Sequence, residues 1–237
     1  MSGTASKPSD PIDAVVYNPY SFAVHDDPYV TYKRLRDEAP AYWNDELDFW
    51  VLSRFADVLE GFRDYETFSS TGGVALEQRG HVNSDFQQMI EKDPPDHTAF
   101  RKLVSRVFTG RRVARMEDEI RRIVNHYIDA VIEQGSCDLV DDITGPFPMD
   151  VISAILGIPE SDRLDLRLNA DKVLIRNDGE LAIPPEAGEG MFGLLGYFIE
   201  DLPKRKAGRR EGLITDLVGL EVDGRSLSDE ELLGFCV

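Results

Sequence analysis

The chain has 237 residues and a formal net charge of −18, with 44 acidic side chains against 26 basic ones. Its 42% hydrophobic and 30% charged content is typical of a globular protein with a sizeable core. The acidic balance argues against nucleic acid or an anionic membrane surface as the main partner, because both require positive potential on the protein. An anionic ligand must therefore meet a local basic patch.

Two cysteines occur, Cys137 and Cys236, and they form neither a zinc-like spacing nor a disulfide framework. This usage favours a reducing compartment, and we predict a cytoplasmic location. The first residues lack the pattern of a signal peptide, and no stretch has the apolar length of a membrane span. We therefore expect no membrane span, and we expect residues 1–20 to be a flexible tail.

The first part of the chain predicts helix, hairpin and helix in that order. A helix should open near Asp27 and Pro28, where apolar residues begin to return at helical spacing. The stretches "AYWN" and "DFWVLS" predict a small hairpin, followed by a helix over residues 54–62. From Ser69 to Lys92 no periodicity holds, and loops of this length are usually functional or disordered.

Beyond Lys92 the sequence predicts an almost wholly helical chain. The expected helices cover residues 96–108, 111–134, 147–156, 161–176, 186–206 and 213–220. A last helix begins in "SDEELLGFCV", where Ser228 and Glu231 predict a capping box. Its apolar residues would open a longer buried helix, so we expect the natural chain to continue past Val237.

The stretch "DPPDHTAFRKLV", residues 93–104, predicts a compact anion site. Pro94–Pro95 should hold the backbone extended and leave Asp96 as the N-cap of a helix. His97 and Arg101, four residues apart, would then lie on one face beside the unpaired amides of the first turn. Such a pair suits paired carboxylates or a phosphate. The alternative is a solvated face, or pairing with Asp93 or Asp96.

A longer stretch, "DPPDHTAFRKLVSRVFTGRRV", resembles the segment that opens the C helix of bacterial cytochromes P-450, and it departs from that pattern mainly at Asp96 and Gly110. The stretches "DPYVTYKRLRDEAPAYWN", "FWVLSRFADVLEGFRDYETFSS", "CDLVDDITGPFPMDVISAILGIPESD" and "SLSDEELLGFCV" are similar to other parts of that family. The resemblance implies a cytochrome P-450 fold, mainly α with a small β-sheet. Residues 21–237 would be the amino-terminal part of a single domain, ending at the start of the I helix.

The resemblance also implies a cofactor and a function. His97 and Arg101 occupy the positions whose side chains hold the haem propionates in the family, which implies haem b as the cofactor. The complete protein would be a haem-thiolate monooxygenase that inserts one oxygen atom from dioxygen into a lipophilic small molecule. The rival hypothesis is a non-enzymatic helical module with a regulatory or interaction role.

Further site residues are implied only by the same resemblance. Met89 and Ile90 would lie near the haem edge, and Val74 and Leu76 would face the substrate. The family's thiolate loop is not matched, since Cys137 and Cys236 lack the glycine that precedes the ligand by four residues. We expect Cys137 to be a loop residue and Cys236 a buried apolar one. No catalytic residue and no metal ligand is expected, and the chain alone should be inactive.

Basic side chains gather after residue 101 on this otherwise acidic chain. The cluster comprises Lys102, Arg106, Arg111, Arg112, Arg115, Arg121 and Arg122. It could steer an acidic electron donor of the ferredoxin type, and solvated helix charge is the alternative. His25, His81 and His126 have no ligand-like companions, and His81 is expected on a loop surface.

Overall fold

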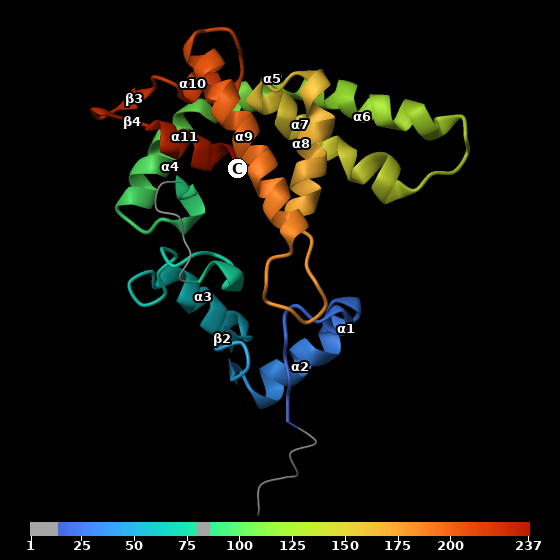
Figure 1. Cartoon of the computed structure of the whole chain (residues 1–237), viewed down its shortest axis with the longest axis vertical. Helices are drawn as coiled ribbons and strands as arrows, with labels where there is room; N and C mark the ends of the chain where they lie inside the picture. The colour runs from blue at the N-terminus through green and yellow to red at the C-terminus, as the bar shows by residue number, and fades with distance from the viewer. Residues whose placement is uncertain (1–13, 80–85) are drawn as a thin grey trace, which may run out of the picture. The chain divides into compact units, whose positions relative to one another are not determined.

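The computed structural model describes residues 14–79 and 86–237. The chain divides into two compact units (Figure 1), and each is described by itself. The first unit contains the described residues up to Ser69 together with residues 176–182, and the second contains the rest. Helices dominate and the strands are few, which confirms a mainly α fold with a small β-sheet. The assignment of residues 21–237 to a single domain stays a prediction.

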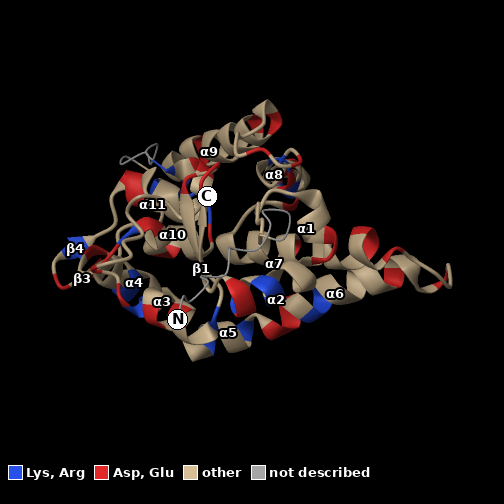
Figure 2. Ribbon diagram, turned by 90° about the horizontal axis from the view of Figure 1, so that it is seen from below, with Lys and Arg blue, Asp and Glu red and all other residues tan. Residues whose placement is uncertain are grey.

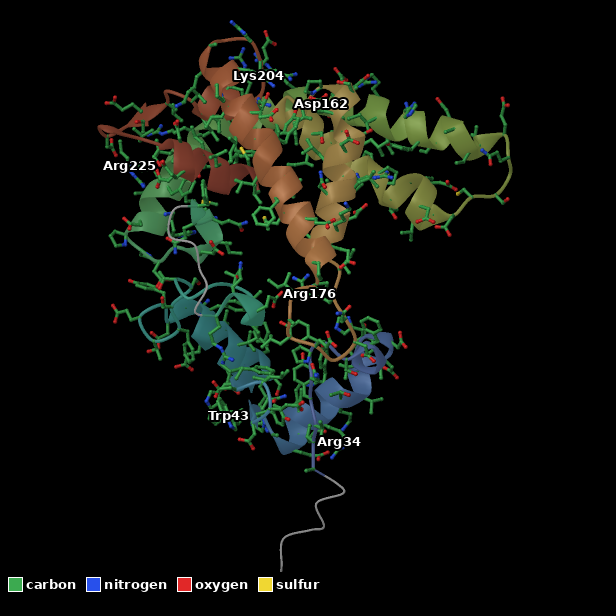
Figure 3. The ribbon with its side chains drawn as sticks, viewed as in Figure 1. Arg34, Trp43, Asp162, Arg176, Lys204 and Arg225 are labelled. Carbon is green, nitrogen blue, oxygen red and sulfur yellow. The ribbon has the colours of Figure 1, made fainter. Side chains whose placement is uncertain are left out.

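The first unit contains the predicted helix, hairpin and helix. Its elements are α1 (Phe22–Asp26), α2 (Pro28–Glu38), β1 (Ala41–Asn44), β2 (Phe49–Leu52) and α3 (Phe55–Arg63). The strands pair antiparallel, with Trp43 opposite Trp50 and their rings 5.1 Å apart. Figure 3 labels Arg34 on α2 and Trp43 on β1. The prediction for this part of the chain is confirmed to within a residue or two.

Buried polar contacts hold the first unit together. The amide of Asn44, only 6% exposed, donates to the carbonyl of Tyr17 at 2.8 Å, and its oxygen accepts from the Leu47 N–H at 2.7 Å. The side-chain amide of Asn18 donates to the carbonyl of Gly179 at 2.9 Å. This bond ties residues 176–182 to the amino-terminal segment, although the two are far apart in sequence.

The described residues of the second unit form helices and one short hairpin. Its elements are η2 (Leu76–Gln78), η4 (Met89–Glu91), α4 (Asp96–Val107), α5 (Gly110–Arg115), α6 (Glu117–Ile132), the π-helix η5 (Val140–Thr144), α7 (Pro146–Leu156), α8 (Glu160–Val173), α9 (Pro185–Lys206), α10 (Leu213–Leu217), β3 (Glu221–Val222), β4 (Arg225–Ser226) and α11 (Asp229–Cys236). The most deeply buried core side chains are Phe100, Leu103, Leu213, Ile214, Leu217 and Leu232. The core therefore joins α4, α10 and α11.

The prediction of one continuous helix over residues 111–134 is wrong, because the structure has two helices there, α5 and α6. They are divided at Met116, whose N–H bonds to the carbonyl of Val113 in a tightened turn. Three acidic residues, 117–119, then open α6, where negative charge favours a new helix start. In α6 only Ile123 is buried, and Val113 on α5 is 53% exposed.

At the end of the second unit the predicted capping box is confirmed, and a short hairpin is present that we did not predict. Ser228 and Glu231 form the predicted capping box, with each side chain accepting the other's backbone N–H at 3.2 Å. The helix expected over residues 213–220 ends at Leu217 instead. A short hairpin follows, turning at Asp223 and Gly224, which both have positive φ. Asp-Gly is a strong hairpin signal that the sequence carried.

A buried arginine ties three segments of the second unit together. Arg205 on α9 is 1% exposed and forms an ion pair with the buried Asp201. Its guanidinium also donates to the carbonyl of Leu156 at 2.8 Å and to those of Gly157 and Glu211 at 3.3 Å. The carboxyl end of α9 is thereby fixed to the end of α7 and to the loop before α10.

Two glycines allow the backbones to cross beside Arg205. Gly157 has φ +76°, and a Cβ atom placed on it would lie 1.8 Å from the carbonyl oxygen of Glu211. Gly212 faces it with φ +117°. Both the left-handed backbone and the close approach therefore require glycine at position 157.

We predict that Gly157→Ala lowers the free energy of unfolding by about 3 kcal/mol or more, because it adds a backbone clash to the strain of positive φ. Gly219→Ala is the matched control, since Gly219 has φ +77° but no atom within 4 Å of an added Cβ. It should cost only about 1 kcal/mol, the strain alone. Urea unfolding measures both, and equal losses would show that the crossing imposes no constraint.

Candidate functional site

The site begins at the first turn of α4, where the chain enters the helix earlier than predicted. Pro95 occupies the N-cap position with helical angles, φ −85° and ψ −14°, and Asp96 follows as the first helical residue without a side-chain cap. The prediction of Asp96 as N-cap is therefore wrong, because the fixed φ of proline suits a helix start. The His97 N–H bonds instead to the carbonyl of Asp93 at 2.9 Å.

One face of α4 is buried in the core, and this burial fixes the direction in which the opposite face points. Phe100, Leu103, Val104 and Val107 are all less than 9% exposed and belong to the core of the second unit. His97, in the first turn, is half-buried, and Arg101, one turn later, is exposed. The predicted spacing of four residues places the imidazole and the guanidinium one above the other.

Within residues 14–79 and 86–237, no acidic side chain pairs with Arg101 and no hydrogen bond engages the His97 ring. Asp93 accepts the Ser70 N–H at 3.0 Å. The neighbouring Lys102, in contrast, forms an ion pair with Asp223. His97 and Arg101 are therefore free to bind an anion from outside this part of the chain.

The other predicted site residues precede α4. Met89 and Ile90 lie in the single turn η4, where Met89 packs against the core and Ile90 is 60% exposed. Val74 is 49% exposed, and Leu76 is half-buried at the start of η2. Neither Val74 nor Leu76 lines the apolar cavity beside η4.

An apolar cavity of about 270 Å³ lies beside these turns. Its walls come from η2, η4, α9, α11 and the segment before η4; the lining residues are Gln78, Phe86, Gln88, Glu91, Met191, Phe192, Leu195, Leu233, Gly234 and Val237. Sequence reasoning missed this set. The Gln78 side chain accepts the N–H of Val74 at 2.8 Å, so the predicted substrate-facing loop is bonded to the cavity wall.

Comparison with known proteins finds relatives of one family along most of the chain. No family model matches the chain. A putative cytochrome P-450 123 of Mycobacterium tuberculosis is 38% identical over 223 residues, 93% of this chain and 56% of that protein. The cytochrome P-450 monooxygenase PikC of Streptomyces venezuelae is 34% identical over 219 residues, 88% of this chain and 50% of that protein.

The fold is also similar to that of a solved cytochrome P-450 structure. Cytochrome P-450 CYP109Q5 from Chondromyces apiculatus superposes with a TM-score of 0.77 at 28% identity, covering 92% of this chain and 54% of that chain. The chain belongs to the bacterial cytochrome P-450 family. It spans about half the length of the curated relatives that it matches. The rival hypothesis of a non-enzymatic module is not favoured by this result.

Membership of the cytochrome P-450 family implies a haem b cofactor, and the residues of α4 fit one of its features. Haem b carries two carboxylate side arms, and burial of such groups requires donors that compensate their charge. An imidazole and a guanidinium on one helix face, both without a partner in the described part of the chain, supply such donors. The chemistry of this donor pair therefore suits the cofactor.

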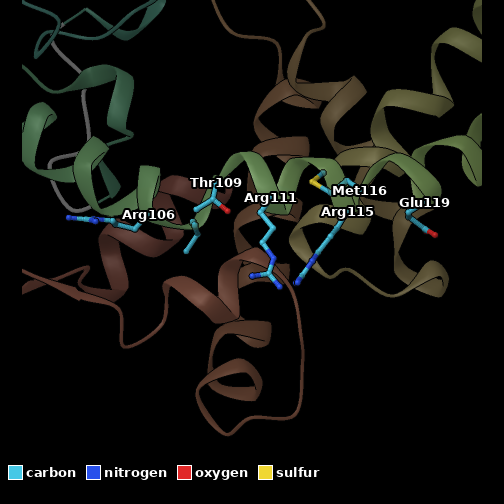
Figure 4. Close-up of a pocket in the computed structure, with 7 residues that line it drawn as sticks. Arg106, Thr109, Arg111, Arg115, Met116 and Glu119 are labelled. Atoms are coloured by element: carbon cyan, nitrogen blue, oxygen red, sulfur yellow. The ribbon is translucent and has the colours of Figure 1, made fainter.

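The predicted basic cluster of this cytochrome P-450 chain is only partly available. Lys102, Arg121 and Arg122 form ion pairs with acidic side chains. Arg106, Arg111 and Arg115 form none within the described residues, and together with Val107, Thr109, Met116 and Glu119 they line a groove of about 660 Å³ (Figure 4). In Figure 4 the side chains of Arg111 and Arg115 extend the same way from the ribbon.

Two of the histidines that lacked a predicted role lie in ordinary surroundings. The His126 ring packs edge-on against Tyr127 at 5.3 Å, and the Nε2 atom of His25 lies 2.7 Å from the carbonyl oxygen of Pro19. His81 lies outside the described residues.

Among the residues that the structure describes, no group of three or more metal-ligating side chains occurs. No helix there has both the length and the apolar character to cross a membrane.

The two cysteines have different environments, as expected. Cys137 is exposed in the loop between α6 and η5, whereas Cys236 is half-buried on α11 against the core. Burial raises the pKa of the Cys236 thiol to about 12, so this thiol stays protonated at neutral pH. The prediction for Cys137 is confirmed, and Cys236 packs against the core as expected but is half-buried rather than fully buried.

We predict that one thiol of this chain reacts quickly with an aromatic disulfide reagent at pH 8 and that this thiol is Cys137. Cys236 should react at least about a hundredfold more slowly, because the thiolate is the nucleophile and a pKa near 12 keeps it scarce. The absorbance of the released thiolate measures both rates. Cys137→Ser should abolish the fast phase and Cys236→Ser should preserve it; the reverse pattern would contradict the burial of Cys236.

Proposed function

We propose that this chain is the haem-anchoring and pocket-forming part of a haem-thiolate monooxygenase, which inserts one oxygen atom from dioxygen into a lipophilic small molecule. Family membership supports the reaction class. The observation that carries the proposal is the pair of hydrogen-bond donors, His97 and Arg101, which have no partner among the described residues and share one side of a helix anchored in the core. The thiolate ligand would come from outside this chain, since neither Cys137 nor Cys236 lies in a suitable loop.

In this proposal His97 and Arg101 bind the two propionates and orient the cofactor. The guanidinium offers a planar fork of donors that stays charged at any physiological pH, and the imidazole adds a donor at a fixed offset. The buried face of α4 prevents the pair from turning away. Bound haem would supply the oxygen activation, and the chain would supply orientation and charge compensation.

The loop before α4 would shape the substrate pocket. Met89 and Ile90 would lie near the haem edge, and Val74 and Leu76 would face the substrate. The exposure of Ile90 and Val74 supports a role in contacts with groups outside the described chain. The apolar cavity beside η4 supports a lipophilic substrate, because six of its ten lining residues have large apolar side chains; these are Phe86, Met191, Phe192, Leu195, Leu233 and Val237.

Electrons would come from an acidic redox partner of the ferredoxin type. The groove of Arg106, Arg111 and Arg115 supports this proposal, because three cations without partners in the described chain form a positive patch on a protein of net charge −18. A cytoplasmic location stays a prediction.

A carbon monoxide difference spectrum of the complete, dithionite-reduced protein tests the proposed function. We expect a Soret band near the position typical of thiolate-ligated haem, and oxygenated product when a ferredoxin system replaces dithionite in air. A colourless but well-folded protein would overturn the proposal, and a haem band without product would overturn the reaction class.

Loss of the anchoring pair should weaken haem retention. We predict that His97→Gln and Arg101→Gln each speed haem transfer to excess apomyoglobin by about tenfold or more, because each removes one charge-assisted contact. Lys102→Gln is the matched control: it lies on the same helix, but its ammonium already pairs with Asp223. The control should change the transfer rate less than twofold. Equal effects of Arg101→Gln and Lys102→Gln would refute the anchoring role.

A further inference from the structure

The cavity beside η4 contains a buried acid in otherwise mostly apolar walls. Glu91 is 6% exposed, and the other lining residues are apolar or carry a neutral amide. No lysine, arginine or histidine belongs to the described lining. Nothing in the sequence marked Glu91 as different from the many acidic residues of this chain.

Among the residues that the structure describes, only neutral groups donate to the Glu91 carboxylate. One oxygen accepts the side-chain amide of Gln78 at 3.1 Å, and the other accepts the backbone N–H of Gln88 at 2.9 Å. No cation pairs with it within the described residues. An ionised carboxylate has about four acceptor positions, so capacity remains for a further donor.

The surrounding structure fixes this carboxylate in place. The oxygen of the Gln78 amide accepts the N–H groups of Val74 and Ala75 at 2.8 and 3.0 Å, which directs its NH₂ group to Glu91. Gly234 of α11 packs against the segment just before Glu91, so closely that a Cβ on it would lie 2.8 Å from the carbonyl oxygen of Gln87. The Glu91 carboxylate is therefore held by two hydrogen bonds, on a backbone segment that packs tightly against α11.

A buried carboxylate without a countercharge is costly, and a ligand can supply the missing charge. We propose that this cavity binds lipophilic cations, with the apolar part against the α9 and α11 walls and a quaternary ammonium or protonated amine at Glu91. The inference rests on the proposed function in that it names the substrate class of the same pocket. The competing role for Glu91 is structural, since its carboxylate also caps the single turn η4.

Calorimetric titration of the complete, haem-loaded protein at pH 7 separates these roles. The probes are octyltrimethylammonium, octanol and octanoate, which share one apolar tail; the quaternary ammonium cannot coordinate iron. No electron donor is present, so the titration reads binding alone. Wild type should bind the ammonium about tenfold more tightly than octanol and should bind octanoate most weakly.

Glu91→Gln should weaken ammonium binding about tenfold and change octanol binding less than twofold, because it removes the charge and keeps the shape. Glu189→Gln is the matched control: it makes the same change on α9, but at a side chain that is 70% exposed. The control should leave all three affinities unchanged.

Several results would overturn the inference. Equal loss of ammonium and octanol binding in Glu91→Gln would assign Glu91 a structural role only. If wild type binds octanol as tightly as octyltrimethylammonium, the cavity has no preference for cations. If Glu189→Gln weakens ammonium binding as much as Glu91→Gln does, the preference comes from the general acidity of the protein. The carbon monoxide spectrum of the same samples shows separately whether the proposed function has failed.

Discussion

The burial of one face of α4 is the constraint on which the rest depends. Phe100 and Leu103 are almost wholly enclosed by the core of the second unit, so the helix cannot rotate without exposing large apolar side chains. That fixed rotation determines where His97 and Arg101 lie. The core itself is closed by Arg205 and by the glycine crossing at Gly157, which hold α7, α9 and α10 together.

Charge is the second organising feature of this cytochrome P-450 chain. Figure 2 shows acidic residues spread over many elements and basic bands along α5. Lys102, Arg121 and Arg122 each pair with a nearby acid, whereas Arg101 on α4 and the arginines lining the α4–α5 groove have no acidic partner among the described residues. The same logic applies in reverse to Glu91, a buried acid without a cation. In each case an unbalanced charge points to a partner outside the described chain.

Sequence reasoning succeeded where a local pattern decides the structure. The four-residue spacing of His97 and Arg101, the capping box at Ser228 and the first hairpin each depend on a few neighbouring residues. It failed where two local rules compete, as at Pro95, which both ends an extended segment and suits a helix start. The division of the 111–134 helix at Met116 was missed because apolar periodicity continues across it. The burial of Glu91 could not be predicted, since it depends on Gln78 and on α11, more than a hundred residues later.

The most direct test of this account is a crystal structure of the complete protein with haem bound. We expect the two propionates within hydrogen-bonding distance of the His97 ring and the Arg101 guanidinium, with Phe100 still enclosed beneath them. Propionates held by other residues, with His97 and Arg101 directed into solvent, would contradict the central claim.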